Sequence, residues 1–157
     1  MKNLSWLFIS LFIIIADQIT KIIALAHLSY ATPVAVMPFV NLTLAFNKGA
    51  AFSMLGQAGG WQLWFFSCVA IAVSVGLGIY LYHLPKKGWL TKLAIALIIG
   101  GALGNVVDRV LRGYVIDFID VYVKQWHWPV FNVADSAITI GAILFIITLM
   151  FNSKVNS

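Results

Sequence analysis

The chain has 157 residues, of which 62% are hydrophobic and 10% are charged, and its mean hydropathy is +0.97. A soluble domain of this length needs more polar surface, so the composition excludes an ordinary soluble protein and indicates one membrane-embedded domain. The formal net charge of +5 is spread thinly, and no block of basic residues predicts nucleic-acid binding. Three scattered histidines and one cysteine offer no metal-ligand spacing, so we expect no metal and no cofactor. We expect that cysteine, Cys68, to be a small core residue of an apolar segment.

Four apolar segments of about 18–22 residues predict transmembrane helices. They cover residues 6–26, 61–82, 90–107 and 133–151. The short alternating stretches typical of a membrane β-barrel are not the pattern of these segments, so a helical bundle is favoured. Asp17 and Lys21 lie four residues apart in the first segment and can pair on one helical face. Because the apolar region of a signal peptide does not normally carry two charges, we expect a true spanning helix there.

Basic residues predict the orientation of the helices. Lys86 and Lys87 lie in the short connection between the second and third segments, which the positive-inside rule places in the cytoplasm. Four spans then place both termini in the cytoplasm, consistent with Lys2 and Lys154. Four further bases fall on the outer side, and we interpret them as functional exceptions: Lys48, Arg109, Arg112 and Lys124.

The two outer connections differ in pattern. In residues 33–56, apolar and less apolar side chains alternate with the period of a half-buried strand, the apolar ones being Val40, Leu42, Leu44 and Phe46. Residues 109–132 carry many aromatic side chains, which suits a segment lying in the headgroup layer. We therefore expect an all-α membrane protein: four transmembrane helices, a small extracytoplasmic β-sheet and an interfacial aromatic-rich loop or helix.

All five acidic residues are aspartates, and the expected topology gathers four of them at the outer membrane surface: Asp108, Asp117, Asp120 and Asp135. An ionisable group at a membrane indicates function or a specific partner. Two neighbouring carboxylates cannot both ionise cheaply, so one keeps a proton while the other is charged. Such a pair can activate a water and protonate a scissile carbonyl. Asp117, which follows a turn, and Asp135, which begins a helix, are the best candidates for it.

The remaining aspartates have plainer interpretations. Asp108 is adjacent to Arg109, and we expect a salt-bridged structural acid there. We expect Asp120 to be solvated. The spacing of Gly100 and Gly104 predicts close packing of the third helix on a neighbour.

Residue patterns alone leave two other functions open. A proton-coupled four-helix transporter would use Asp17 as its proton site, since that acid lies nearer the middle of a helix. A non-catalytic assembly subunit would use the aspartates only as helix caps.

Five segments in chain order carry a resemblance to a known family. They are DQITK (17–21), NKGAAF (47–52), GGALGNVVDR (100–109), VIDFID (115–120) and FNVADS (131–136). At these residues the sequence resembles the lipoprotein signal peptidases, or signal peptidase II, which are bacterial intramembrane aspartyl peptidases. Five motifs in the right order on four spans make the resemblance specific.

The resemblance implies removal of the signal peptide from diacylglyceryl-modified prolipoproteins, with the cut N-terminal to the lipidated cysteine. It implies that Asp117 and Asp135 are the catalytic pair and that Asp17 and Lys21 maintain the fold. Residues that bind substrate or support the site would be Asn47, Gly49, Asn105, Arg109 and Asn132. We expect a monomer in the bacterial inner membrane whose partners are these substrates and membrane lipid, with its site near the extracytoplasmic face.

Overall fold

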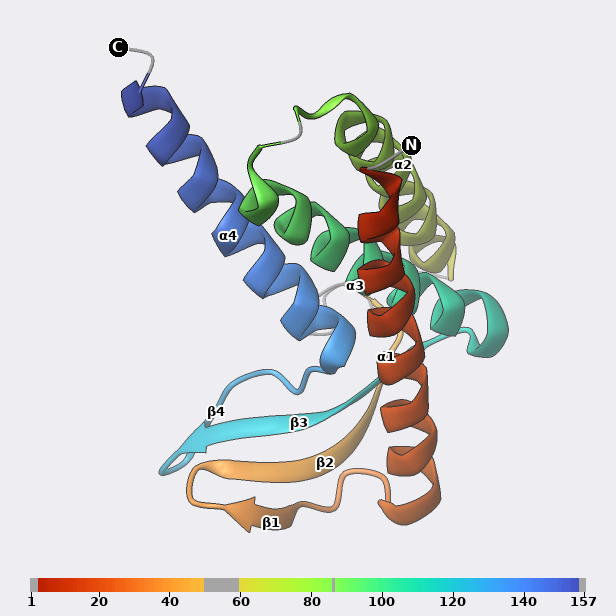
Figure 1. The fold of residues 1–157 in the computed structure, drawn as a ribbon. Helices are drawn as coiled ribbons and strands as arrows, with labels where there is room; N and C mark the ends of the chain where they lie inside the picture. Colours follow the sequence, from red (N-terminus) through yellow and green to blue (C-terminus); the bar gives the residue numbers. More distant parts are fainter. Residues whose placement is uncertain (1–2, 50–59, 86, 156–157) are drawn as a thin grey trace.

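The computed structural model describes residues 3–49, 60–85 and 87–155, which form a helical bundle and one antiparallel sheet (Figure 1). The helices are η1 (Leu4–Trp6), α1 (Leu7–His27), α2 (Trp61–His83), α3 (Trp89–Arg112) and α4 (Val133–Val155). The strands are β1 (Val34–Met37), β2 (Val40–Asn47), β3 (Val115–Val123) and β4 (Trp126–His127). Four stretches in this described part are long and apolar enough to cross a membrane: Leu4–His27, Trp61–His83, Trp89–Arg112 and Val133–Phe151. The predicted combination of four spanning helices with a small sheet is confirmed.

Helix α3 is the central helix and packs against α1, α2 and α4 (Figure 1). Its most apolar window is 67% buried, against 22% or less for the other three spans. Glycines let the neighbours approach: a Cβ on Gly100 would lie 2.9 Å from a backbone oxygen of α1, and one on Gly101 would lie 2.3 Å from the carbonyl oxygen of Ala134. A Cβ on Gly104 would lie 3.0 Å from the carboxylate of Asp17. The predicted close packing at Gly100 and Gly104 is therefore confirmed.

The sheet has the strand order β1-β2-β3-β4 and lies across one end of the bundle, beside the start of α4 (Figure 1). Helix α1 continues past that end and packs its Ala24 against the sheet. The buried residues of this contact are Ala24, Leu44, Ile116 and Phe118. The β2–β3 register pairs Ala45 with Asp117 and Asn47 with Val115. Packing and register together place the start of β3 close to the first turn of α4.

Two expectations about these connections need correction, and a third lies partly outside the described residues. The aromatic segment between α3 and α4 is not a loop or helix, because its backbone pairs with β2 and with itself as β3 and β4. The predicted strand at residues 40–47 exists, but its alternation is incomplete: of its apolar residues only Leu44 is buried, and Asn41 is buried as well. Residues 50–56 of the predicted strand region lie outside the described residues.

Cys68 is exposed, so the expectation that it lies in the core is wrong. Helix α2 lies at the side of the bundle, and only 11% of its apolar window is buried. The high hydropathy of this segment is thus not explained by burial in the protein, and it suits a helix whose outer face meets lipid.

Candidate active site

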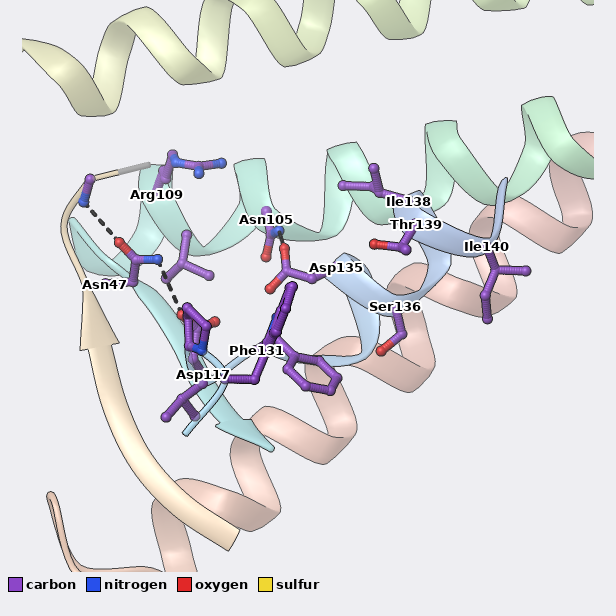
Figure 2. A pocket seen from close by; sticks show the side chains of 15 residues that line it. Asn47, Asn105, Arg109, Asp117, Phe131, Asp135, Ser136, Ile138, Thr139 and Ile140 are labelled. Atoms are coloured by element: carbon purple, nitrogen blue, oxygen red, sulfur yellow. Dashed lines mark hydrogen bonds between the residues drawn. The ribbon is translucent and has the colours of Figure 1, made fainter. Parts of the chain in front are cut away.

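A pocket of about 640 Å³ lies where the sheet meets the first turns of α4 (Figure 2). Asp117 of β3 and Asp135 of α4 both line it. Asn47, Gly49, Asn105 and Arg109 line it as well. Six of the seven candidate catalytic or supporting residues thus share one cavity, although they come from four different elements or their ends. Asn132 lies beneath them and is fully buried.

Asp117 is held by two side-chain amides. Its carboxylate accepts a hydrogen bond from Asn132 Nδ2 at 2.7 Å and from Asn47 Nδ2 at 3.2 Å. Asn47 is itself oriented, because its Oδ1 accepts the backbone N–H of Gly49 at 3.0 Å. Asp117 is only 3% exposed, and this burial together with the nearby charge of Asp135 raises its pKa from 3.8 to about 7.

Asp135 lies at the third position of α4 and forms a reciprocal cap with Asn132. The Asp135 backbone N–H donates to Asn132 Oδ1 at 2.9 Å, and Asp135 Oδ2 accepts the Asn132 backbone N–H at 3.2 Å. This is the capping-box arrangement, with aspartate in place of the usual glutamate. The other oxygen of Asp135 accepts from Asn105 Nδ2 at 2.8 Å. The expected helix start at Asp135 is thus present, and the cap fixes the direction of the carboxylate.

A buried ionic cluster lies behind the pocket. Lys21 Nζ lies 2.8 Å from a carboxylate oxygen of Asp17 and 2.8 Å from one of Asp108, and all three side chains are fully buried. Its third contact is Asn105 Oδ1, at 3.0 Å. The predicted pairing of Asp17 with Lys21 is present. Because Asp17 also accepts the backbone N–H of Ala134 at 3.0 Å, the cluster ties α1 to the start of α4.

Asp108 is a salt-bridged acid as expected, but its partner is not its neighbour Arg109. Consecutive residues of a helix point in different directions, and Asp108 instead pairs with Arg112 one turn later as well as with Lys21. Its Oδ2 also accepts the backbone N–H of Ile116 at 3.1 Å. Asp108 therefore holds the start of β3, one residue before Asp117.

Two members of this network were not among the candidates from the sequence. Gln18 Nε2 contacts both Asp17 and Asp108, and its Oε1 accepts from Arg112 at 3.1 Å. The i,i+4 spacing of Asp108 and Arg112 was a usable signal for one of these contacts. Gln18 offered none beyond its place in the DQITK motif.

Arg109 lines the pocket, and part of its guanidinium has no hydrogen-bond partner in the described part of the chain. Its Nε is buried and has no hydrogen-bond partner among the described residues. The guanidinium lies 5.9 Å from the ring centroid of Phe66 in α2, a cation–π distance. Its charge interacts with those of Asp135, Asp117 and Asp108. Arg109 therefore brings a positive charge to the wall of the pocket that Asp117 and Asp135 also line.

Asp120 is 2% exposed, so the expectation that it is solvated is wrong. Its carboxylate lies 2.8 Å from His127 Nδ1 and accepts from Thr43 at 3.1 Å and Asn41 at 3.4 Å. It does not line the pocket. Three residues of β2 and β4 converge on it, so Asp120 joins the strands on either side of β3.

Known proteins similar to this chain are found both by sequence and by structure. A family model described as signal peptidase II matches residues 9–151. Lipoprotein signal peptidases of Acinetobacter baumannii and Teredinibacter turnerae are 54% and 50% identical over 152 residues, which is 97% of this chain and 86% and 90% of those proteins. The one of Burkholderia mallei is 52% identical over 143 residues, 90% of this chain and 84% of that protein. Two solved bacterial membrane enzymes have TM-scores of 0.86 and 0.80 at 35% and 37% identity, covering 98% and 92% of this chain and 92% of each of theirs.

Proposed function

This chain belongs to the signal peptidase II family, and from that premise we propose that it is the aspartyl endopeptidase that removes signal peptides from diacylglyceryl-modified prolipoproteins. The cut is N-terminal to the lipidated cysteine. The observation that carries the aspartyl mechanism is the shared pocket of Asp117 and Asp135. They come from separate elements, and amide or backbone N–H donors orient both.

The pair supplies the acid and the base of peptide hydrolysis. One carboxylate accepts a proton from a water whose oxygen attacks the scissile carbonyl carbon, while the protonated partner gives its proton to the carbonyl oxygen. The resulting diol collapses: the C–N bond breaks, the amine nitrogen takes the proton held by the first carboxylate, and a diol hydroxyl returns one to the second. The burial of Asp117, whose pKa is about 7, supports a pair that holds one proton at neutral pH.

Side chains beside the pair are available for the substrate. In this proposal Arg109 donates to a substrate carbonyl or lipid headgroup, since its positively charged side chain lines the same pocket as Asp117 and Asp135. The pocket continues from Asp135 along α4 past Ile138 and Ile140, as Figure 2 shows. Because α4 is a candidate membrane span from Val133 onward, this apolar wall suits the acyl chains of a substrate that stays in the bilayer.

The cellular setting is part of the proposal. The four membrane-length helices and the family support a bacterial membrane protein. In this proposal it is a monomer in the inner membrane. Both of its termini lie in the cytoplasm, on the basis of Lys87 and the neighbouring basic residues between α2 and α3. That orientation puts the sheet and the pocket at the extracytoplasmic face.

A cleavage assay tests the proposal. The purified protein is incubated with a diacylglyceryl prolipoprotein, signal-peptide release is followed by gel shift, and mass spectrometry locates the cut. We expect Asp117→Asn and Asp135→Asn each to lower the rate by at least about 100-fold. Asp120→Asn is the matched control, because it neutralises a buried aspartate of the same strand that does not line the pocket. Wild-type rates in both pocket variants would exclude the aspartyl mechanism.

A further inference from the structure

Asp117 and Asp135 have different surroundings, and the difference bears on which of them holds the proton. Asp117 is buried on a strand, whereas Asp135 is half-buried at the start of a helix. Charge is less costly where water reaches it. The N-terminal turn of α4 adds the positive end of a helix dipole and the backbone N–H of Asn132 to Asp135 alone. The greater exposure of Asp135 and its place at the start of α4 both favour the negative charge on this residue.

Lys21 supplies a third influence that favours the negative charge on Asp135. Its ammonium group has only donors, so Asn105 must turn its carbonyl oxygen toward Lys21, at 3.0 Å. That orientation directs the amide nitrogen of Asn105 at Asp135, 2.8 Å away. A cation at the carbonyl end polarises the amide and strengthens the donor at its other end. The hydrogen bond that Asp135 receives is thus linked to a buried positive charge.

The charge of Lys21 also acts on Asp117, but through space and not through a donor that Lys21 orients. The closest partner of Asp117, Asn132 Nδ2, is shared with Asn105 Oδ1 and the carbonyl oxygen of Ile116, both at 3.2 Å. One amino group with two hydrogens is therefore divided among three acceptors. Its second donor, Asn47, is oriented by a neutral backbone N–H.

We propose that Lys21, acting through Asn105, keeps the negative charge of the pair on Asp135 and leaves the proton on Asp117. The proposal rests on the proposed aspartyl mechanism and assigns its order: Asp135 accepts the proton of the water, and Asp117 protonates the scissile carbonyl. Lys21 is a positioning residue, since it touches Asn105 and not the pocket. Its role extends beyond holding α1 to α3.

Other charges around Asp135 decide how the test is built. They are Asp17 and Lys21 on α1, Asp108 and Arg109 on α3, and Asp117 on β3. Removing Lys21 alone would leave the buried carboxylates of Asp17 and Asp108 with too little positive charge. The test therefore uses Asp17→Asn as a background, in which Arg112 balances Asp108 after Lys21 is neutralised.

The experiment compares pH profiles of kcat/KM for Asp17→Asn and for Asp17→Asn with Lys21→Gln. Glutamine keeps N–H donors for Asn105 but removes the charge. Because the base must be ionised, we expect the acidic limb of the double variant to lie higher by about half a pH unit or more. A uniform loss of rate at every pH with an unmoved limb would be a purely structural effect and would overturn the proposal. If the double variant does not fold, Lys21→Met in the same background takes its place.

A spectroscopic measurement on folded protein gives a second test. Near pH 6 the infrared band of a protonated carboxyl group should be present in the wild type and lost in Asp117→Asn. Retention of the band in Asp117→Asn, with its loss in Asp135→Asn, would place the proton on Asp135 and overturn the proposal. Failure of the proposed function would look different, because both pocket variants would then cleave normally.

Discussion

Asn132 and Asp135 cap one another at the start of α4, each donating its backbone N–H to the side chain of the other. The same Asn132 side chain donates to Asp117 at 2.7 Å. One buried asparagine thus orients both carboxylates of the pair. Asn132 links the start of α4 to β3. Its two functions, capping α4 and donating to Asp117, can be separated by substitution.

Asn132→Ala and Asn132→Ser are both expected to lower activity, and the alanine variant should lose more stability than the serine variant. Serine is a good N-cap and can still accept the backbone N–H of Asp135, but it is too short to donate to Asp117. The alanine variant should lose about 1 kcal/mol more stability than the serine variant, with similar loss of cleavage rate. Thermal unfolding in detergent and the cleavage assay check this. Equal stability of the two variants would show that the cap contributes little.

The basic limb of the activity profile should fall near pH 7. In the proposed order Asp117 must be protonated, and its pKa is raised to about 7 chiefly by burial and then by the charge of Asp135. Activity therefore declines as pH rises through that value. The kcat/KM profile with a saturable synthetic lipopeptide measures it. A profile flat from about pH 6 to 9 would contradict the assignment.

The same pKa predicts a dependence of stability on pH. Because the pKa of Asp117 is higher in the folded state than its ordinary 3.8, its contribution to stability is fully present below about pH 4 and is lost as pH rises through about 7. Asp117→Asn removes this pH-dependent contribution to stability. The variant should gain thermal stability relative to the wild type as pH rises from about 4 to about 7, measured by unfolding temperature. A constant difference across that range would argue against a raised pKa.

Gly101→Ala should separate α3 from α4. The added Cβ would lie 2.3 Å from the carbonyl oxygen of Ala134, so one helix must shift, at a cost of about 1–3 kcal/mol. Cleavage should also fall, since Asp135 is the residue after Ala134. Gly76→Ala is the control, because a Cβ there meets nothing within 4 Å and alanine favours a helix. Equal unfolding temperatures for the two variants would show that this contact is not tight.

Asp120→Ala should weaken the sheet without removing a pocket residue. Asn41, Thr43 and His127 would all lose their acceptor, and we expect a loss of about 1–3 kcal/mol. His127→Ala should cost less, because His127 is 48% exposed and water can replace it. Unfolding temperature measures both. Cleavage by Asp120→Ala well below its unfolding temperature should stay within about threefold of the wild type.

Much of the architecture was readable along the chain. Hydropathy and segment length located the four spanning helices, because a bilayer imposes about the same apolar length on any helix that crosses it. The alternation of apolar and less apolar residues predicted the strand at residues 40–47. It did not predict that Asn41 is buried and donates to Asp120. The aromatic content of residues 109–132 was misleading, since pairing with β2 decides whether such a segment is a strand.

The pair Asp117 and Asp135 was also predicted, from residue type, from order and from a family resemblance. The residues that surround the pair were not predicted. Asp17 meets the backbone of Ala134 across 117 positions of sequence, and Gln18 meets Arg112 across 94. The partner of a buried charge depends on which helix faces pack together, and small residues such as Gly101 determine that packing. The sequence by itself determined which segments enter the membrane and which acids are available. Only the tertiary structure decided which donors each carboxylate receives, because those donors come from elements that are distant along the chain.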